Sequence, residues 1–189
     1  FHPAFRFTGP SRREIGVPTV FNLLGPMANP APVSFMVVGV GDPKAATVMA
    51  HALVTRGVNR AWVVHGHGGM DELSLSGKCP VVEMINGKLR EFEIDPRSLG
   101  LGFAEVAAVR GGEPRDNAKT FREMLDGSKG PIRDIVLLNA AAGIVVAGKA
   151  DDMQQGIEIA TSSIDSGSAR DVLDEVIRVS VDAAKHMAH

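Results

Sequence analysis

The stretch SFMVVGVGDPKAATVMAHALVTRGVNRAWVV, residues 34–64, decides the fold class. It opens with a continuous apolar run (34–40), continues with a helical segment (42–57) and closes with a second apolar run (60–64). Strands without alternation of polar and apolar residues are buried on both faces, and two such strands are usually joined by a right-handed crossover helix. The stretch therefore predicts a βαβ unit with two parallel strands.

The ends of the predicted helix carry residues that usually begin and end helices. Asp42 is the candidate N-cap, Pro43 occupies the first helical position and Gly57 follows the last turn. Before this unit, residues 1–33 are rich in proline and are predicted to be mostly irregular, with one or two short helical turns.

The segments after the unit combine a hairpin with helices. Asn86 and Gly87 favour a tight turn between antiparallel strands over residues 79–95. Helices are expected at 115–127, 130–150 and 162–185. Two short strands are an alternative for the second of these, but Pro131 suits a first helical turn and the alanines disfavour strands. We expect an α/β fold in a single domain over residues 1–189: a mainly parallel sheet, helices on both faces and a small antiparallel hairpin.

Composition excludes several classes of function. The chain has 189 residues, of which 20 are Lys or Arg and 22 are Asp or Glu, so its formal net charge is -2. This balance provides no basic surface for nucleic acid. The longest apolar stretch, residues 135–148, is too short for a membrane span and contains Asn139. The single cysteine, Cys79, rules out an internal disulfide and fits a reducing compartment, so we expect the cytoplasm.

A glycine-rich loop follows the second predicted strand. Its sequence, HGHGGMDELSLSG (65–77), places the adjacent carboxylates Asp71 and Glu72 just beyond the carboxyl end of that strand. Ligands of open parallel sheets bind outside this edge, and Mg²⁺ is commonly held by one or two carboxylates together with waters and substrate phosphates. The pair predicts a divalent-cation site; the alternative is an acidic turn that faces solvent.

Other polar residues give weaker signals. The two histidines of the loop lack enough neighbouring ligands for zinc, and GVGDPK (39–44) does not complete the GxGxxG phosphate motif. Arg12 and Arg13 can hold a carboxylate or a phosphate as an arginine fork, although the residues alone favour a pair of solvated charges. Asn22 and the turn LLGP (23–26) leave the same two interpretations open.

Several stretches together resemble one family. They are HPAF (2–5), RREIGVPTVFNLLGPMANP (12–30), VVHGHGGMDELSLSG (63–77), RGGEPRDNA (110–118), KGPIRDIVLLNAAAGIVVAGKA (129–150) and SSIDSGSA (162–169). In this order and with this spacing, they closely resemble the carboxyl-terminal part of the anthranilate phosphoribosyltransferase family. The resemblance covers nearly the whole chain, and its most specific pieces are REIG followed by FNLLGP and the later GMDELS.

The resemblance implies a reaction and roles for individual residues. The family transfers the phosphoribosyl group from phosphoribosyl pyrophosphate to the amine of anthranilate in tryptophan biosynthesis, and we expect the full-length protein to be a homodimer. Asp71 and Glu72 match the acidic pair that holds Mg²⁺ on the pyrophosphate, and Arg12 matches the arginine that binds the anthranilate carboxylate. The positions assigned to the path of the aromatic acid and its adjoining turn are His2, Pro26, Gly25 and Asn22. No protein nucleophile is expected, because displacement at an anomeric carbon depends mainly on positioning and charge stabilisation.

The family also has features upstream of these motifs, namely a small helical domain that forms the dimer and a Gly-Thr-Gly-Gly-Asp loop that binds pyrophosphate. Neither occurs in the sequence. We therefore expect an incomplete nucleoside phosphorylase/phosphoribosyltransferase α/β domain with little or no transferase activity on its own. Two alternatives stay open: a pyrimidine-nucleoside phosphorylase of the same fold, and a non-catalytic binding module in which the acidic pair only closes a turn.

Overall fold

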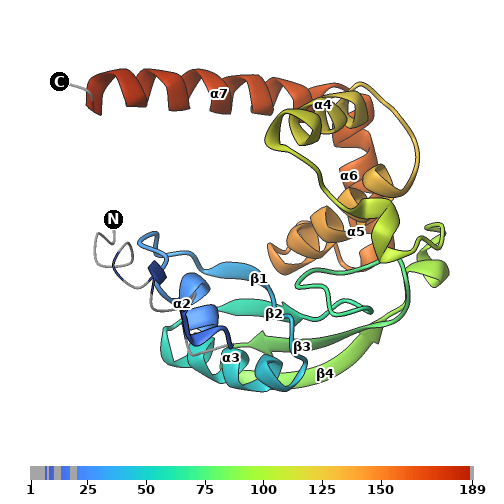
Figure 1. The fold of residues 1–189 in the computed structure, drawn as a ribbon. Coiled ribbons are helices and arrows are strands. Elements are labelled where there is room, and N and C mark those ends of the chain that lie inside the picture. The colour runs from blue at the N-terminus through green and yellow to red at the C-terminus, as the bar shows by residue number, and fades with distance from the viewer. Residues whose placement is uncertain (1–6, 8, 11–13, 18–20, 188–189) are drawn as a thin grey trace.

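The structure, a computed structural model, describes residues 7, 9–10, 14–17 and 21–187. The centre of the molecule is a four-stranded sheet with the strand order β1-β2-β3-β4 (Figure 1). Its strands are β1 (Phe35–Gly39), β2 (Arg60–Val64), β3 (Cys79–Ile85) and β4 (Lys88–Ile94). Within the described residues, β1 and β4 are the two edges of this sheet.

The predicted βαβ unit is confirmed. Helix α3 (Lys44–Thr55) connects β1 to β2, and the two strands are parallel along their whole length. The prediction of Asp42 as the N-cap is wrong by one position, because the helix begins at Lys44 with Pro43 as its cap residue. The Asp42 carboxylate nevertheless accepts the Lys44 amide N–H at 2.9 Å, so it stabilises the turn that leads into the helix.

The prediction of a mainly parallel sheet is wrong for the described strands, because β1 and β2 form the only parallel pair among them. Loop 65–78 returns the chain to the free edge of β2 without a crossover helix, so β3 has to run in the opposite direction. The predicted hairpin therefore extends the sheet instead of standing beside it. Its turn has a positive φ at Asn86 (48°) and at Gly87 (78°), as the predicted type I′ turn requires.

Helices cover both faces of the sheet, as predicted (Figure 1). On one face, Met49 and Leu53 of α3 belong to a core that also includes residues of β2 and β3, and the short helix α2 (Phe21–Met27) packs beside α3. On the other face, helix α5 (Pro131–Val146) contributes Leu138 and Val145 to the second core. The predicted helix over residues 130–150 is confirmed by α5.

The carboxyl-terminal half of the chain is helical. Two short 3-10 helices, η1 (Pro96–Leu99) and η2 (Val106–Val109), lead from β4 to α4 (Pro114–Leu125), which matches the helix predicted at 115–127. Helix α6 (Met153–Asp165) packs along α5.

The single helix predicted at 162–185 is wrong, because α6 ends at Asp165 and α7 (Ser168–Met187) is a separate helix. Gly167, with φ of 84°, separates the two, and this left-handed backbone conformation ends a helix. Helix α7 starts beside α4 and α6 and runs along the top of the view in Figure 1. Among the described residues, no helix combines the length and the apolar character needed to cross a membrane.

Candidate functional site

The carboxylates Asp71 and Glu72 lie in loop 65–78, which leaves β2 at the carboxyl edge of the parallel pair. Both side chains are exposed, whereas Leu73 and Leu75, which follow them, are buried in the core between the sheet and α5. The two leucines anchor the loop and leave the carboxylates facing outward. The structure thus places the acidic pair at the edge of the sheet where the sequence predicts a site.

The loop is also fixed by hydrogen bonds to α5. The side-chain amide of Asn139 accepts the Leu73 N–H at 2.9 Å and donates to the Leu73 carbonyl at 2.8 Å. This pair of bonds satisfies both backbone polar groups of a fully buried residue. The backbone next to Glu72 is consequently tied to the opposite layer of the domain.

A tight glycine turn precedes the acidic pair. The Gly66 N–H donates to the Met70 carbonyl at 2.8 Å, and Gly68 and Gly69 adopt φ values of 85° and 84°. L-residues with a Cβ rarely adopt such values, so glycine is required at this sharp reversal. The Ser74 and Ser76 hydroxyls both donate to the carbonyl of His67 at the tip of the turn, at 3.0 and 3.1 Å.

The negative charges of the acidic pair are not neutralised by a neighbouring basic side chain among the described residues. Partial burial and then the neighbouring charge of Asp71 raise the pKa of Glu72 above its ordinary value. In the part of the chain that the structure describes, neither carboxylate forms an ion pair with a lysine, an arginine or a histidine. A cation bound between the two side chains would remove their repulsion.

The donor set fits Mg²⁺ held jointly by protein and substrate. Among the described residues, no group of three or more His, Cys, Asp or Glu side chains is arranged to hold a metal ion. Mg²⁺ retains several waters and is usually bound by one or two carboxylates plus substrate phosphates. Asp71 and Glu72 supply two carboxylates, and the remaining ligands would come from water and from a phosphorylated substrate.

The histidines of the loop make bonds that hold the backbone. His65 Nδ1 lies 2.8 Å from the carbonyl of Val40, so the imidazole links the segments that follow β1 and β2. His67 Nδ1 lies 3.3 Å from the Ser76 hydroxyl oxygen. Both contacts connect residues of the site region to each other, which gives these side chains a structural role.

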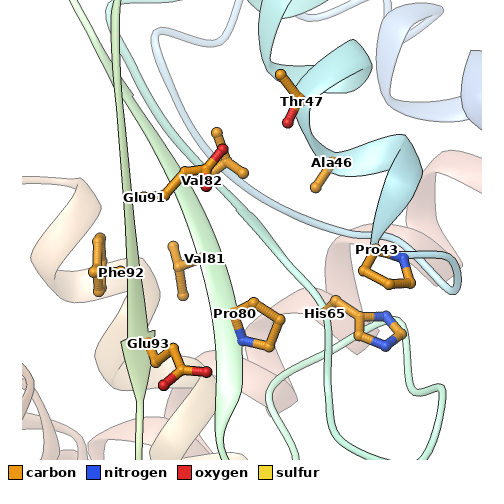
Figure 2. Close-up of a pocket in the computed structure, with 10 residues that line it drawn as sticks. All are labelled: Pro43, Ala46, Thr47, His65, Pro80, Val81, Val82, Glu91, Phe92 and Glu93. Carbon is orange, nitrogen blue, oxygen red and sulfur yellow. The ribbon is translucent and has the colours of Figure 1, made fainter.

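His65 also lines a pocket of about 460 Å³ on the α3 face of the sheet (Figure 2). The carboxylates of Glu91 and Glu93 come from β4, and Pro43 comes from the turn before α3. Lys78 forms an ion pair with Glu93 at 3.4 Å. Neither Asp71 nor Glu72 lines this pocket, so it is separate from the predicted cation site.

The residues predicted to bind anthranilate fall mainly in the first segment of the chain. His2 and Arg12 lie outside the described residues. Asn22, Gly25 and Pro26 belong to α2, where Gly25 and Pro26 form part of its last turn.

The structure does not bring Gly25 and Pro26 together with the acidic pair. Arg56, which follows the last residue of α3, donates from Nη1 to the Pro26 carbonyl at 3.0 Å and so holds α2 beside the end of α3. The end of α3 precedes β2 and lies at the amino edge of the parallel strands, opposite the edge that carries Asp71 (Figure 1). The five residues of β1 span about 17 Å at 3.3 Å per residue, which sets the scale of this separation.

A second carboxylate site, which the sequence did not reveal, lies within the sheet, on β3 between β2 and β4. The Glu83 side chain is 2% exposed; its Oε1 accepts from Trp62 Nε1 at 2.8 Å and from Arg60 Nη2 at 3.0 Å. Its Oε2 accepts from Arg90 Nε at 3.0 Å and from Arg90 Nη2 at 2.6 Å. Arg60 Nη1 also donates to the Val145 carbonyl at 2.8 Å, which ties the sheet to the end of α5.

Comparison with known proteins identifies the family of the chain. Residues 1–170 match the family described as "Glycosyl transferase family, a/b domain". The chain belongs to this glycosyl transferase family. It is a homologue of the anthranilate phosphoribosyltransferases, as the following relatives show.

Relatives of this glycosyl transferase chain include anthranilate phosphoribosyltransferase from Hyphomonas neptunium, 44% identical over 180 residues that cover 95% of this chain and 53% of the relative. The crystal structure of the Thermus thermophilus enzyme matches with a TM-score of 0.84 and 44% identity, covering 93% of this chain and 52% of that one. The Saccharomyces cerevisiae enzyme in complex with PRPP and Mg matches with a TM-score of 0.80 and 30% identity, covering 88% and 48%. The same yeast enzyme in complex with 4-fluoroanthranilate has a TM-score of 0.81 at 31% identity, covering 88% and 49%. The chain thus spans about half the length of these relatives.

Sequence reasoning missed the residues of this glycosyl transferase domain that hold the acidic loop in place. Asn139 had a visible signal, because a lone amide in a long apolar stretch needs a polar partner when it is buried. The alternation Leu-Ser-Leu-Ser at 73–76 was a second signal, because period-two alternation indicates an extended segment with one buried face. The partner of each group was visible only in the fold.

Proposed function

We propose that the protein to which this chain belongs transfers the phosphoribosyl group from phosphoribosyl pyrophosphate to anthranilate, and that Asp71 and Glu72 hold the Mg²⁺ of the pyrophosphate. One observation carries the proposal: two adjacent carboxylates without a cationic partner among the described residues project from a rigid loop at the carboxyl edge of parallel strands. Family membership supports it, and so do relatives whose complexes contain PRPP and Mg or 4-fluoroanthranilate.

The role proposed for the acidic pair is to bind a cation that compensates negative charge on the substrate. Bound Mg²⁺ would neutralise the charge that develops on the departing pyrophosphate. Asp71 and Glu72 would bind the cation and fix its position relative to the sheet. The tethers from Asn139, Leu73 and Ser74 limit movement of the loop, and such preorganisation lowers the cost of stabilising the transition state.

Anthranilate recognition is proposed for the first segment of the chain. In this proposal Arg12 holds the carboxylate of anthranilate through its guanidinium fork. His2, Asn22, Gly25 and Pro26 are proposed to line the approach of the aromatic ring. Gly25 and Pro26 lie at the opposite edge from the acidic pair, so this part of the proposal is supported by family membership alone.

Metal titration tests the proposal on the purified chain. Isothermal titration with Mg²⁺ is expected to show a single site, and Asp71→Asn or Glu72→Gln should weaken it at least tenfold, since even outer partners of metal ligands contribute about 10- to 100-fold. Glu91→Gln is the matched control, because it removes the same charge from an exposed carboxylate on β4. Equal affinity in the native chain and in both site variants would refute the metal assignment.

Substrate titration separates the alternative functions. With Mg²⁺ present, phosphoribosyl pyrophosphate should increase the affinity of the chain for anthranilate. Arg12→Ala should lower the affinity for anthranilate without changing the affinity for Mg²⁺. Binding of thymidine in preference to anthranilate would support a pyrimidine-nucleoside phosphorylase. A chain that binds Mg²⁺ through neither Asp71 nor Glu72 would support the non-catalytic module.

A further inference from the structure

The glycine Gly39 lies directly beneath the acidic pair. It is the last residue of β1, and its backbone touches the loop that follows β2. A Cβ built on Gly39 would lie 1.5 Å from the carbonyl oxygen of Asp71 and 2.3 Å from its carbonyl carbon. No side chain fits such a contact, so the backbone of Asp71 can take this position only because residue 39 has none.

A second glycine occupies the equivalent place beneath Glu72. Gly66 lies just beyond the end of β2, and a Cβ on it would lie 2.1 Å from the carbonyl oxygen of Glu72. The same atom would be 2.9 Å from Cβ of Met70 and 3.1 Å from Cβ of Ser74. The backbone carbonyl of each acidic residue therefore contacts a glycine at, or just beyond, the end of one of the two parallel strands.

The requirement at Gly39 is one of space and not of backbone conformation. The φ angle of Gly39 is not positive, so an alanine could adopt the same backbone angles. Gly41, two residues later, is different, because a Cβ there would meet the Gly69 carbonyl oxygen at 3.9 Å, an ordinary van der Waals distance. The Gly-Val-Gly sequence at 39–41 resembles the beginning of a nucleotide-binding motif. Only Gly39 is required for the close approach of the loop, whereas the space around Gly41 would accommodate a Cβ.

We propose that Gly39 and Gly66 are positioning residues of the cation site, because the absence of their side chains allows the backbone of Asp71 and Glu72 to pack closely against the ends of β1 and β2. This inference rests on the proposed function of the acidic pair. A Cβ at either position would displace the loop and, with it, the two carboxylates proposed to bind the cation. The Leu73 anchor and the glycine contacts together fix the backbone on both sides of Glu72.

The test compares Gly39→Ala with Gly41→Ala by titration with Mg²⁺. Gly39→Ala should weaken Mg²⁺ binding at least tenfold, as displaced metal ligands do, whereas Gly41→Ala should keep the native affinity. Gly66→Ala, which displaces Glu72 by the same mechanism, should also weaken binding. Fluorescence of Trp62, the only tryptophan, reports whether each variant is folded, because this buried residue lies in the sheet and donates to Glu83.

A second measurement separates positioning from a general loss of stability. Hydrogen exchange of the amides at 71–75 should accelerate in Gly39→Ala, because the displaced loop loses its contact with the end of β1. Exchange in β2 and β3 should not change, since the substitution leaves their pairing intact. Native Mg²⁺ affinity and unchanged hydrogen exchange at 71–75 in folded Gly39→Ala would overturn the inference while leaving the metal assignment intact; absence of Mg²⁺ binding by Asp71 and Glu72 in the native chain would overturn both.

Discussion

The interior of the sheet and its carboxyl edge differ in how their carboxylates are neutralised. Within the sheet, Glu83 is buried and accepts hydrogen bonds from one tryptophan and two arginines. At the carboxyl edge, Asp71 and Glu72 stand side by side and, among the described residues, form no ion pair. A carboxylate whose charge is satisfied inside the chain stabilises the fold, whereas carboxylates that are held together without a counter-charge are suited to bind a cation from outside.

The pKa values express the same contrast. Burial alone would raise the pKa of Glu83, but the hydrogen bonds from Trp62, Arg60 and Arg90 outweigh it and lower the value. At Glu72, burial and the charge of Asp71 act in the same direction and raise the pKa. The difference therefore lies in what each carboxylate contacts and not in burial by itself.

The largest effect on stability is expected from Glu83→Ala. The substitution leaves Arg60, whose side chain is 24% exposed, without its carboxylate partner, and breaking such a buried pair costs about 3–5 kcal/mol. Urea unfolding followed by Trp62 fluorescence measures the change in the free energy of unfolding. Arg90→Ala is the graded control: the Arg90 side chain is 70% exposed, so its loss should cost only up to about 1 kcal/mol. Equal costs for the two variants would contradict the view of Glu83 as a buried structural charge.

A smaller loss of stability is expected from Asn139→Ala. This change leaves the N–H and carbonyl of Leu73 without partners in a buried place, which costs about 1–3 kcal/mol. The loop that carries Glu72 should also become more mobile, so hydrogen exchange of residues 71–75 should accelerate. Asn139→Leu fills the volume without restoring the hydrogen bonds; full recovery of stability in that variant would show that packing, and not the amide, holds the loop.

The smallest effect is expected in the pH dependence of stability, where the two glutamates have opposite signs. The stabilising contribution of Glu83 is present above the ordinary glutamate pKa of 4.5 and is lost as the pH falls below it toward the lowered folded value. Glu72 destabilises the fold above its raised pKa, and this cost is relieved as the pH falls through that value toward 4.5.

Unfolding curves as a function of pH test this pair of signs. Glu72→Gln should remove the gain at mildly acidic pH, and Glu83→Gln should remove the loss at lower pH. For the same reason, Mg²⁺ should bind more weakly as the pH falls through the raised pKa of Glu72, because the protonated carboxyl group is a poor ligand. A stability curve of Glu72→Gln that is parallel to that of the native chain would contradict the raised pKa.

Prediction from sequence succeeded where a local pattern was sufficient. The strands at 34–40 and 60–64, the helix between them and the Asn86-Gly87 turn all depend on residues close together in the chain. It failed where the outcome depended on pairing: the direction of β3 follows from its place on the edge of β2, which its own residues do not encode. It also failed at Gly167, since the apolar spacing after Val172 gave no sign that the helix begins anew there.

For the site, the sequence by itself determined the chemistry. Two adjacent carboxylates in a short glycine-rich loop after an apolar strand have to lie near the carboxyl end of that strand, because the loop begins where the strand ends. Only the tertiary structure decided what keeps them there. Asn139 is 66 residues from Leu73, and Gly39 belongs to a different strand from Asp71, so their contacts arise only when the layers pack. The physical reason is that side-chain chemistry is local to a residue, whereas the space and the hydrogen-bond partners around it are provided by distant segments of the folded chain.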